Sequence, residues 1–151
     1  MHRLEPFAVA PAQMKAWYEF SMSLKALEPG VQELVKIRSS QINGCARCLQ
    51  MHTADARKAG ESDERLFLLE AWRETEGVYT EREQAALAWT ESLTRLAEKG
   101  APDDVYERLE QVFNAEEQVE LTLLINVING WNRLGVGFAG PVRSTAEIKA
   151  A

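Results

Sequence analysis

The sequence predicts an all-α fold, a compact bundle of six or seven helices in a single domain. Its apolar residues recur at helical intervals of three and four wherever they follow a regular spacing. No segment alternates apolar and polar residues as a strand does, and no Asn-Gly turn joins two such segments. The chain has 151 residues, 46% of them hydrophobic, so it can bury one core and is too apolar to be disordered.

Helix-breaking residues divide the first part of the chain. We expect the first helix to end at Pro29-Gly30, because proline and glycine are the poorest helix formers. Asn43-Gly44 interrupts the second helix, and Gly60 follows the third at a position where glycine commonly ends a helix. These three helices are expected at residues 12–27, 31–41 and 45–59.

Capping residues open the later helices. Ser62 and Asn114 can each cap the helix that follows, and Thr80 with Glu83 has the pattern of a capping box. We expect residues 1–143 to form the domain, and residues 144–151, which lack apolar periodicity, to be a frayed tail. The later helices are expected at residues 63–73, 80–100, 102–113 and 115–135.

The last expected helix is apolar around most of its circumference. Such a helix is buried on most sides, either in the centre of a core or against another subunit. Because one domain of this length has little surface to cover it, we expect a homo-oligomer of at least two subunits. The apolar positions are 119, 121, 123, 124, 125, 127, 128, 131 and 134.

Charge and hydropathy exclude several kinds of partner. The formal net charge is −6, so the chain has no basic stripe with which to neutralise nucleic-acid phosphates. No apolar run approaches the ~20 residues that span a bilayer, and the N-terminus lacks the apolar region of a signal peptide. We therefore expect a cytoplasmic protein without a nucleic-acid or membrane partner. In that compartment, paired cysteines are more often catalytic or metal-binding than structural.

Residues 42–52 read INGCARCLQMH and contain both cysteines of the chain and one of its two histidines. Cys45, Cys48 and His52 share one helix face. Mid-helix neighbours at this spacing have Cβ atoms about 5–6 Å apart, whereas a disulfide needs about 3.5–4.5 Å. A bridge therefore requires Cys45 in the opening turn, where Asn43-Gly44 lets the backbone adjust. Free N–H groups there favour a thiolate, and His52 is within reach to accept the proton of Cys48.

Three simpler interpretations compete with redox chemistry. The cysteines and His52 can be ordinary core residues, because a small buried thiol is common. Cys45, Cys48 and His52 can also be three zinc ligands. The sequence offers no clear fourth ligand, because His2 is remote and the spacing does not assign Glu33 to the site. Considered alone, Glu33 is a helical glutamate that can pair with Lys36 three residues later.

The stretch ELVKIRSSQINGCARCLQMHTADARKAGESDERLFLLEAWRE resembles the AhpD-like alkylhydroperoxidases, within the wider carboxymuconolactone decarboxylase family. The C-x-x-C-x-x-x-H core, a glutamate twelve residues before the first cysteine and the later INGWNRL segment carry this resemblance. It implies an AhpD-like helical fold, homo-oligomers that are often trimers or hexamers, and reduction of a peroxide substrate at the expense of a dithiol or thioredoxin-like reductant. No metal or other cofactor is expected.

The resemblance also implies roles for four residues. Cys48 would attack the peroxide and become a sulfenic acid, Cys45 would condense with it, and Glu33 with His52 would relay a proton. From spacing alone, Cys45 would ionise more readily because it lies nearer the helix start, so spacing and resemblance favour different sulfurs for the attack. The family histidine before the second cysteine is replaced here by Arg47, which favours a thiolate but cannot shuttle a proton at neutral pH.

Two other functions remain open. A decarboxylase acting on a γ-lactone acid, like the enzyme that names the family, needs no cysteine pair, so the C-x-x-C motif counts against it. A non-enzymatic thiol redox sensor would use the same disulfide to change packing. Peroxide consumption by the reduced protein separates both from a thiol peroxidase. We expect Trp72, Trp131 and Asn132 to be packing or interface residues.

Overall fold

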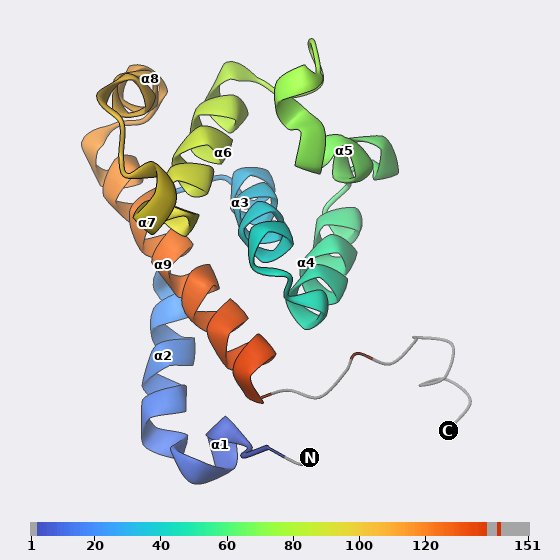
Figure 1. Cartoon of the computed structure of the whole chain (residues 1–151), viewed down its shortest axis with the longest axis vertical. Helices are drawn as coiled ribbons and strands as arrows, with labels where there is room; N and C mark the ends of the chain where they lie inside the picture. Colours follow the sequence, from blue (N-terminus) through green and yellow to red (C-terminus); the bar gives the residue numbers. More distant parts are fainter. Residues whose placement is uncertain (1–2, 139–141, 143–151) are drawn as a thin grey trace.

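The structure is a computed structural model that describes residues 3–138 and 142 (Figure 1). This part of the chain contains helices and no strand, so the prediction of an all-α fold is confirmed. Its helices, in chain order, are α1 (Pro6–Val9), α2 (Pro11–Ser23), α3 (Pro29–Asn43), α4 (Ala46–Lys58), α5 (Asp63–Leu68), the 3₁₀-helix η1 (Leu69–Glu74), α6 (Glu81–Thr94), α7 (Leu96–Lys99), α8 (Asp103–Val112) and α9 (Ala115–Phe138).

Helix α3 lies at the centre of the bundle and packs against α4, α6 and α9 (Figure 1). Its two faces are buried in different apolar clusters. Val31 and Val35 belong to a cluster with residues of α6, α8 and α9. Leu34 and Ile37 belong to a second cluster with residues of α4, α5, η1 and α6. Because close packing on both sides leaves α3 little room to shift, its C-terminal end, where the C-x-x-C motif begins, is held in place.

The capping residues expected from the sequence are confirmed. Ser62 accepts a backbone N–H from the first turn of α5 at 3.2 Å. At the start of α6, the amide of Glu83 donates to the Thr80 hydroxyl at 3.2 Å, and the amide of Thr80 donates to the Glu83 carboxylate at 2.8 Å. Asn114 accepts a backbone N–H from the first turn of α9 at 3.0 Å. Each cap uses groups three residues apart, so local sequence is enough to predict it.

The described residues contain more helices than the six or seven expected. The expected helix 63–73 changes to 3₁₀ geometry at its second half, where Ala71 has non-helical angles (φ −106°, ψ 24°). The expected helix 80–100 breaks at Arg95 (φ −107°, ψ 37°) into α6 and α7. Just before this break, the Thr94 hydroxyl bonds with Asn129 of α9 at 3.1 Å. Helix α1, which was not expected, is four residues long, too short to reveal a periodicity.

Helix α9 is mostly buried by the chain's own helices. Its apolar positions pack against α3, α6 and α8, while Val119 remains 60% exposed. The apolar surface of α9 therefore does not by itself require a second subunit, and the oligomer expected from it stays a prediction. The buried apolar residues of α9 are Leu121, Leu124, Ile125, Val127 and Ile128.

Within the described residues, no helix is both long enough and apolar enough to cross a membrane. The expected tail, residues 144–151, lies outside the described residues, and so does the expected domain boundary at residue 143. Both stay predictions.

Candidate thiol site

Helices α3 and α4 meet at a tight corner built on Gly44. This residue has left-handed backbone angles (φ 65°, ψ 32°), which a residue with a Cβ adopts only under strain. The amide of Gly44 donates to the Gln41 carbonyl at 3.2 Å, and the amide of Cys45 donates to the Ser40 carbonyl at 3.0 Å. These bonds close the last turn of α3, so Cys45 stands directly before the first residue of α4.

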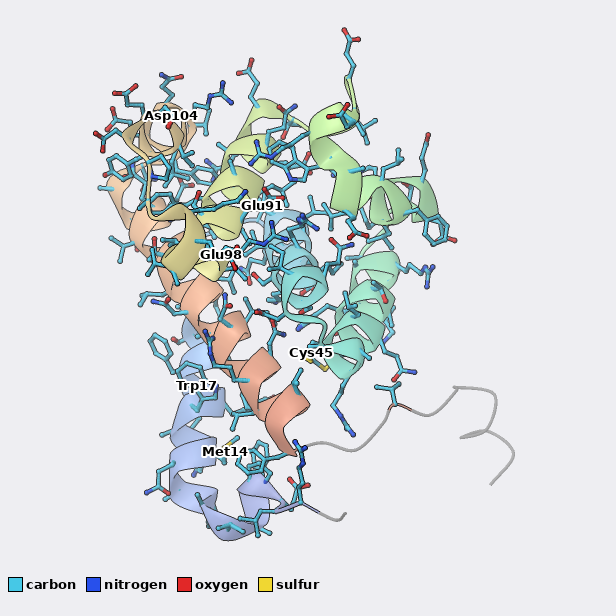
Figure 2. All side chains as sticks on the ribbon, viewed as in Figure 1. Met14, Trp17, Cys45, Glu91, Glu98 and Asp104 are labelled. Atoms are coloured by element: carbon cyan, nitrogen blue, oxygen red, sulfur yellow. A yellow bond between two sulfur atoms is a disulfide. The ribbon has the colours of Figure 1, made fainter. Side chains whose placement is uncertain are left out.

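Cys45 and Cys48 form a disulfide at the start of α4. Cys45 is the N-cap and has extended backbone angles (φ −86°, ψ 90°), whereas Cys48 lies in the first helical turn. Their Cα atoms are 5.4 Å apart. Figure 2 shows Cys45 where α3 meets α4, facing the C-terminal end of α9. The opening-turn position expected from Asn43-Gly44 is therefore present, and both sulfurs are buried, with Cys45 1% and Cys48 5% exposed.

Glu33 of α3 and His52 of α4 lie in contact across the two helices. The Glu33 Oε2 atom is 3.0 Å from His52 Nδ1, and Glu33 Oε1 accepts a hydrogen bond from Lys36 Nζ at 2.8 Å. Both interpretations of Glu33 from the sequence thus hold geometrically, because its two oxygens serve different partners. Burial raises the pKa of Glu33, but the hydrogen bonds from His52 and Lys36 outweigh it and lower the pKa below its ordinary value. The carboxylate therefore stays charged at neutral pH.

The structure brings together all four residues that the sequence singled out, through two helices and one corner. Cys45 caps the N-terminus of α4, Cys48 and His52 lie in its N-terminal half, and Glu33 comes from the second turn of α3. When the carboxylate accepts the Nδ1 proton of His52, the Nε2 atom is the one left to accept a proton. Arg47, which stands at the position of the family histidine, is exposed on the outer side of the first turn of α4.

Asparagine side chains bind the corner between α3 and α4 to α9. Only part of this cluster was expected from the sequence. The Asn43 amide donates to Asn129 Oδ1 at 2.9 Å and to Asn132 Oδ1 at 2.8 Å. The amide of Asn132 in turn donates to the Ser40 hydroxyl at 3.0 Å. Asn132 was expected to pack, but Asn129 was missed; the signal was three asparagines spaced three residues apart, Asn126, Asn129 and Asn132, in a stretch rich in apolar residues. These bonds hold the backbone that leads into Gly44 and Cys45 against α9.

A buried ion cluster on the other side of α3 was missed. Figure 2 shows Glu91 in the interior between α6 and α3. Its Oε1 atom accepts hydrogen bonds from Arg38 and Trp72, each at 2.9 Å, and its Oε2 atom accepts one from Arg73 at 3.0 Å. Burial raises the pKa of Glu91, but the hydrogen bonds from Trp72, Arg73 and Arg38 lower it below its ordinary value. The cluster joins α3, η1 and α6, and Trp72 is a packing residue, as expected.

Within the part of the chain that the structure describes, the zinc site considered from the sequence is not formed. Among residues 3–138 and 142, no three His, Cys, Asp or Glu side chains are grouped so as to hold one metal ion. Cys45 and Cys48, which would supply two thiolate ligands, are bonded to each other here.

Comparison with known proteins identifies relatives over nearly the whole chain. Residues 11–92, more than half of the sequence, match the carboxymuconolactone decarboxylase family. The uncharacterized protein YdfG of Bacillus subtilis (strain 168) is 39% identical over 144 residues, which cover 94% of this chain and 97% of YdfG.

Solved structures share the fold. A protein of unknown function from Agrobacterium tumefaciens, proposed to be the antioxidant defence protein AhpD, is 40% identical. It aligns with a TM-score of 0.86 and covers 95% of this chain and 100% of its own. The debrominase Bmp8 is 15% identical and aligns with a TM-score of 0.76 over 90% of this chain and 72% of its own. At that identity, the similarity to Bmp8 concerns the fold alone.

Proposed function

The chain belongs to the carboxymuconolactone decarboxylase family, and on that premise we propose that it is a thiol-dependent peroxidase acting on hydrogen peroxide and alkyl hydroperoxides. The observation that carries this proposal is the disulfide between the only two cysteines of the chain, at a helix start and one turn from the Glu33–His52 pair. The similarity to the A. tumefaciens protein proposed to be an antioxidant defence protein supports it.

The proposed reaction starts from the reduced pair. The Cys48 thiolate attacks the distal oxygen of the hydroperoxide, an S–O bond forms, and the O–O bond breaks. The alkoxide takes a proton and leaves as the alcohol, or as water from hydrogen peroxide. Cys45 then attacks the sulfur of the Cys48 sulfenic acid, so that the S–S bond forms and the hydroxyl group leaves as water. A dithiol or thioredoxin-like reductant supplies two electrons and two protons and restores both thiols by disulfide exchange.

His52 is the proposed proton carrier for Cys48, and Glu33 is its positioning partner. His52 lies one turn after Cys48 on α4, and the 3.0 Å contact with Glu33 favours the tautomer whose Nε2 atom can accept a proton. The charged Glu33 also stabilises the imidazolium that forms when the proton is taken. The hydrogen bonds from His52 and from Lys36, one on each oxygen of Glu33, lower its pKa and keep the carboxylate ionised.

We also propose that the protein is a homo-oligomer, a trimer or hexamer, that acts in the cytoplasm. Support for the assembly comes from the N-terminal segment rather than from α9. Six large apolar side chains there are at least 40% exposed, and contact with a second copy of the chain would remove them from water. They are Leu4, Phe7, Val9, Tyr18, Phe20 and Met22.

Peroxide consumption tests the proposed function. The reduced protein should consume one equivalent of hydrogen peroxide without a reductant, and should turn over repeatedly when dithiothreitol is present. Cys48→Ser should consume none under either condition. A wild-type protein that forms its disulfide slowly, without faster peroxide loss than free dithiothreitol, would be a redox sensor and not a peroxidase.

A further inference from the structure

A cavity of about 670 Å³ lies between α9 and the break that separates α6 from α7. Figure 1 shows α7 beside α9 at this place. Pockets that bind small molecules have volumes of about 300–1,000 Å³, so this cavity can hold a small organic molecule. Neither cysteine lines it, nor does Glu33 or His52. The cavity is therefore separate from the thiol site.

Two arginines that line this cavity have no carboxylate partner. Arg95 is half-buried at the break after α6, and Arg133 is exposed on α9. Within the described residues, neither side chain forms an ion pair or a hydrogen bond. Their guanidinium groups are therefore available to an anion from outside the chain. Other arginines do pair with carboxylates, which are abundant in a chain of net charge −6: Arg38, Arg57, Arg65, Arg73 and Arg82.

Helix dipoles do not account for both arginines. A cation directly after a helix interacts favourably with the carbonyl end of that helix, which is sufficient to explain Arg95. Arg133 lies before the last turn of α9, which contains no basic residue, so this effect does not explain its position. Glu98, labelled in Figure 2, also lines the cavity but pairs with neither arginine in the described part of the chain. Two arginines and one glutamate give the described lining a net charge of +1.

The wall that α9 contributes is polar and held in place. Asn126, Asn129 and Arg133 share one face of α9 because they are three, four and seven residues apart. Asn129 is 6% exposed; its amide donates to the Thr94 hydroxyl at 3.1 Å, and its Oδ1 atom accepts from Asn43 at 2.9 Å. Asn126 is exposed, and its amide forms no hydrogen bond within the described residues. This amide adds N–H donors beside Arg133 on a wall that is already ordered.

We propose that this cavity is a binding site for a small organic acid, in which Arg95 and Arg133 bind a carboxylate or phosphate group. The planar guanidinium group presents paired N–H donors that match the oxygens of either anion. Ile42, Leu93 and Leu96 also line the cavity, and Leu96 is 56% exposed. A ligand with a short apolar body next to its anionic group would remove these side chains from water. The site binds its ligand without any step of the thiol chemistry, so it is independent of the proposed peroxidase reaction.

Isothermal titration calorimetry with four probes tests the ligand class. Hexanoate and phenyl phosphate carry the two candidate anionic groups, 1-hexanol is the neutral counterpart of hexanoate, and acetate lacks the apolar body. We expect saturable binding of hexanoate, of phenyl phosphate or of both, and the probe that binds more tightly identifies the preferred anion. Acetate and 1-hexanol should each bind at least about tenfold more weakly than the better probe, because each lacks one of the two kinds of contact. No saturable binding of either anion at millimolar concentration, or equal binding of 1-hexanol or acetate, would overturn the proposal.

Substitution of the arginines tests the place of binding. Arg95→Gln and Arg133→Gln should each weaken binding of the better probe by about tenfold, the loss expected for hydrogen bonds to a charged group. Arg108→Gln is the matched control, because it removes the same charge from an exposed position of α8 that lines a different cavity. Its affinity should equal that of wild type. Equal weakening by all three variants would show a response to net charge alone and would overturn the proposal.

Lysine variants keep the test decisive if Arg95→Gln does not fold. Arg95→Lys and Arg133→Lys keep the charge but lose the paired donors of the guanidinium group. Each should bind the better probe more weakly than wild type while its circular dichroism spectrum is unchanged. Wild-type affinity in both lysine variants would contradict binding by the two guanidinium groups.

Discussion

Each carboxylate oxygen of Glu33 binds a different partner: one binds a lysine, and the other binds the histidine of the thiol site. Lys36 is bound through Oε1 at 2.8 Å and His52 through Oε2 at 3.0 Å. The lowered pKa of Glu33 means that the carboxylate stays ionised well below neutral pH. Glu33 therefore remains a charged hydrogen-bond acceptor for His52 at neutral pH.

The role of His52 leads to a prediction at the scale of a single residue. His52→Ala should lower peroxide reduction at pH 7 by about tenfold, because Cys48 loses its proton acceptor. The rate should recover as the pH rises, since hydroxide then removes the proton. Glu33→Gln should cause a smaller loss, because it acts through His52. The pH profile of thiol alkylation measures both effects, with His2→Ala as the control for the other histidine. A His52→Ala profile identical to wild type would make His52 a packing residue.

At the scale of the element, the corner between α3 and α4 depends on the left-handed conformation of Gly44. Gly44→Ala should lower the free energy of unfolding by about 1–2 kcal/mol, the cost of placing a residue with a Cβ in that conformation. Gly30→Ala is the control, since Gly30 lies in the first turn of α3 without a positive φ. Apart from α3 itself, no atom of the described residues lies within 4 Å of a new Cβ there. Urea denaturation compares the two, and equal stabilities would show that the corner relaxes without strain.

The Glu91 cluster joins three elements and should make stability depend on pH. Glu91→Gln should lower the free energy of unfolding by about 3 kcal/mol at pH 7, because Arg38 then lacks its charged partner. The pKa of Glu91 is lowered by folding from 4.5, so its stabilising contribution is complete above that pH and is lost as the pH falls through the lower folded-state value.

The difference between wild type and Glu91→Gln should therefore narrow below about pH 4, where the wild-type carboxylate also becomes neutral. Denaturation curves at several pH values measure this narrowing. Glu110→Gln, a substitution at an exposed position of α8, serves as the control and should leave the free energy of unfolding almost unchanged at every pH. A constant difference down to pH 3 would mean that Glu91 contributes through packing and not through its charge.

At the scale of the whole molecule, the exposed apolar residues of α2 predict self-association. Wild type should be an oligomer in light scattering at micromolar concentration, and Tyr18→Asp/Met22→Asp should shift it toward monomer. These side chains are 51% and 57% exposed and lie one turn apart on α2. Phe67→Asp, at a 75% exposed position on α5, should leave the assembly unchanged. A wild-type protein that is monomeric under these conditions would contradict the prediction.

Most of the fold could be predicted from the sequence because helix starts depend on neighbouring residues. The caps at Ser62, Thr80 and Asn114 each use a partner three residues away, and apolar periodicity covers the helices between them. The break at Arg95 could not be predicted in this way, since Thr94 is held by Asn129 of α9, far along the chain. Tertiary contacts of this kind override local helix propensity.

The same distinction between local and long-range contacts applies to the candidate site. The position of Cys45 at a helix start follows from Asn43-Gly44, two adjacent residues. The partnership of Glu33 with His52 came from the family resemblance, because nineteen residues separate them and no local pattern joins them. The close approach of α9 to the sulfurs was not predicted at all: a Cβ atom on Gly135 of α9 would stand 3.0 Å from Cys45 Sγ, and only the path of α9 across the bundle brings it there.

The central claim, that Cys48 is oxidised by peroxide and Cys45 resolves it, is tested most directly by trapping the intermediate. Cys45→Ser should consume one equivalent of hydrogen peroxide and then stop, leaving a Cys48 sulfenic acid that dimedone labels and mass spectrometry detects. Cys48→Ser, measured in parallel, should form no adduct. If Cys48→Ser alone forms the adduct, the two sulfurs have the opposite roles. If neither variant is labelled and wild type consumes no peroxide, the protein is not a thiol peroxidase.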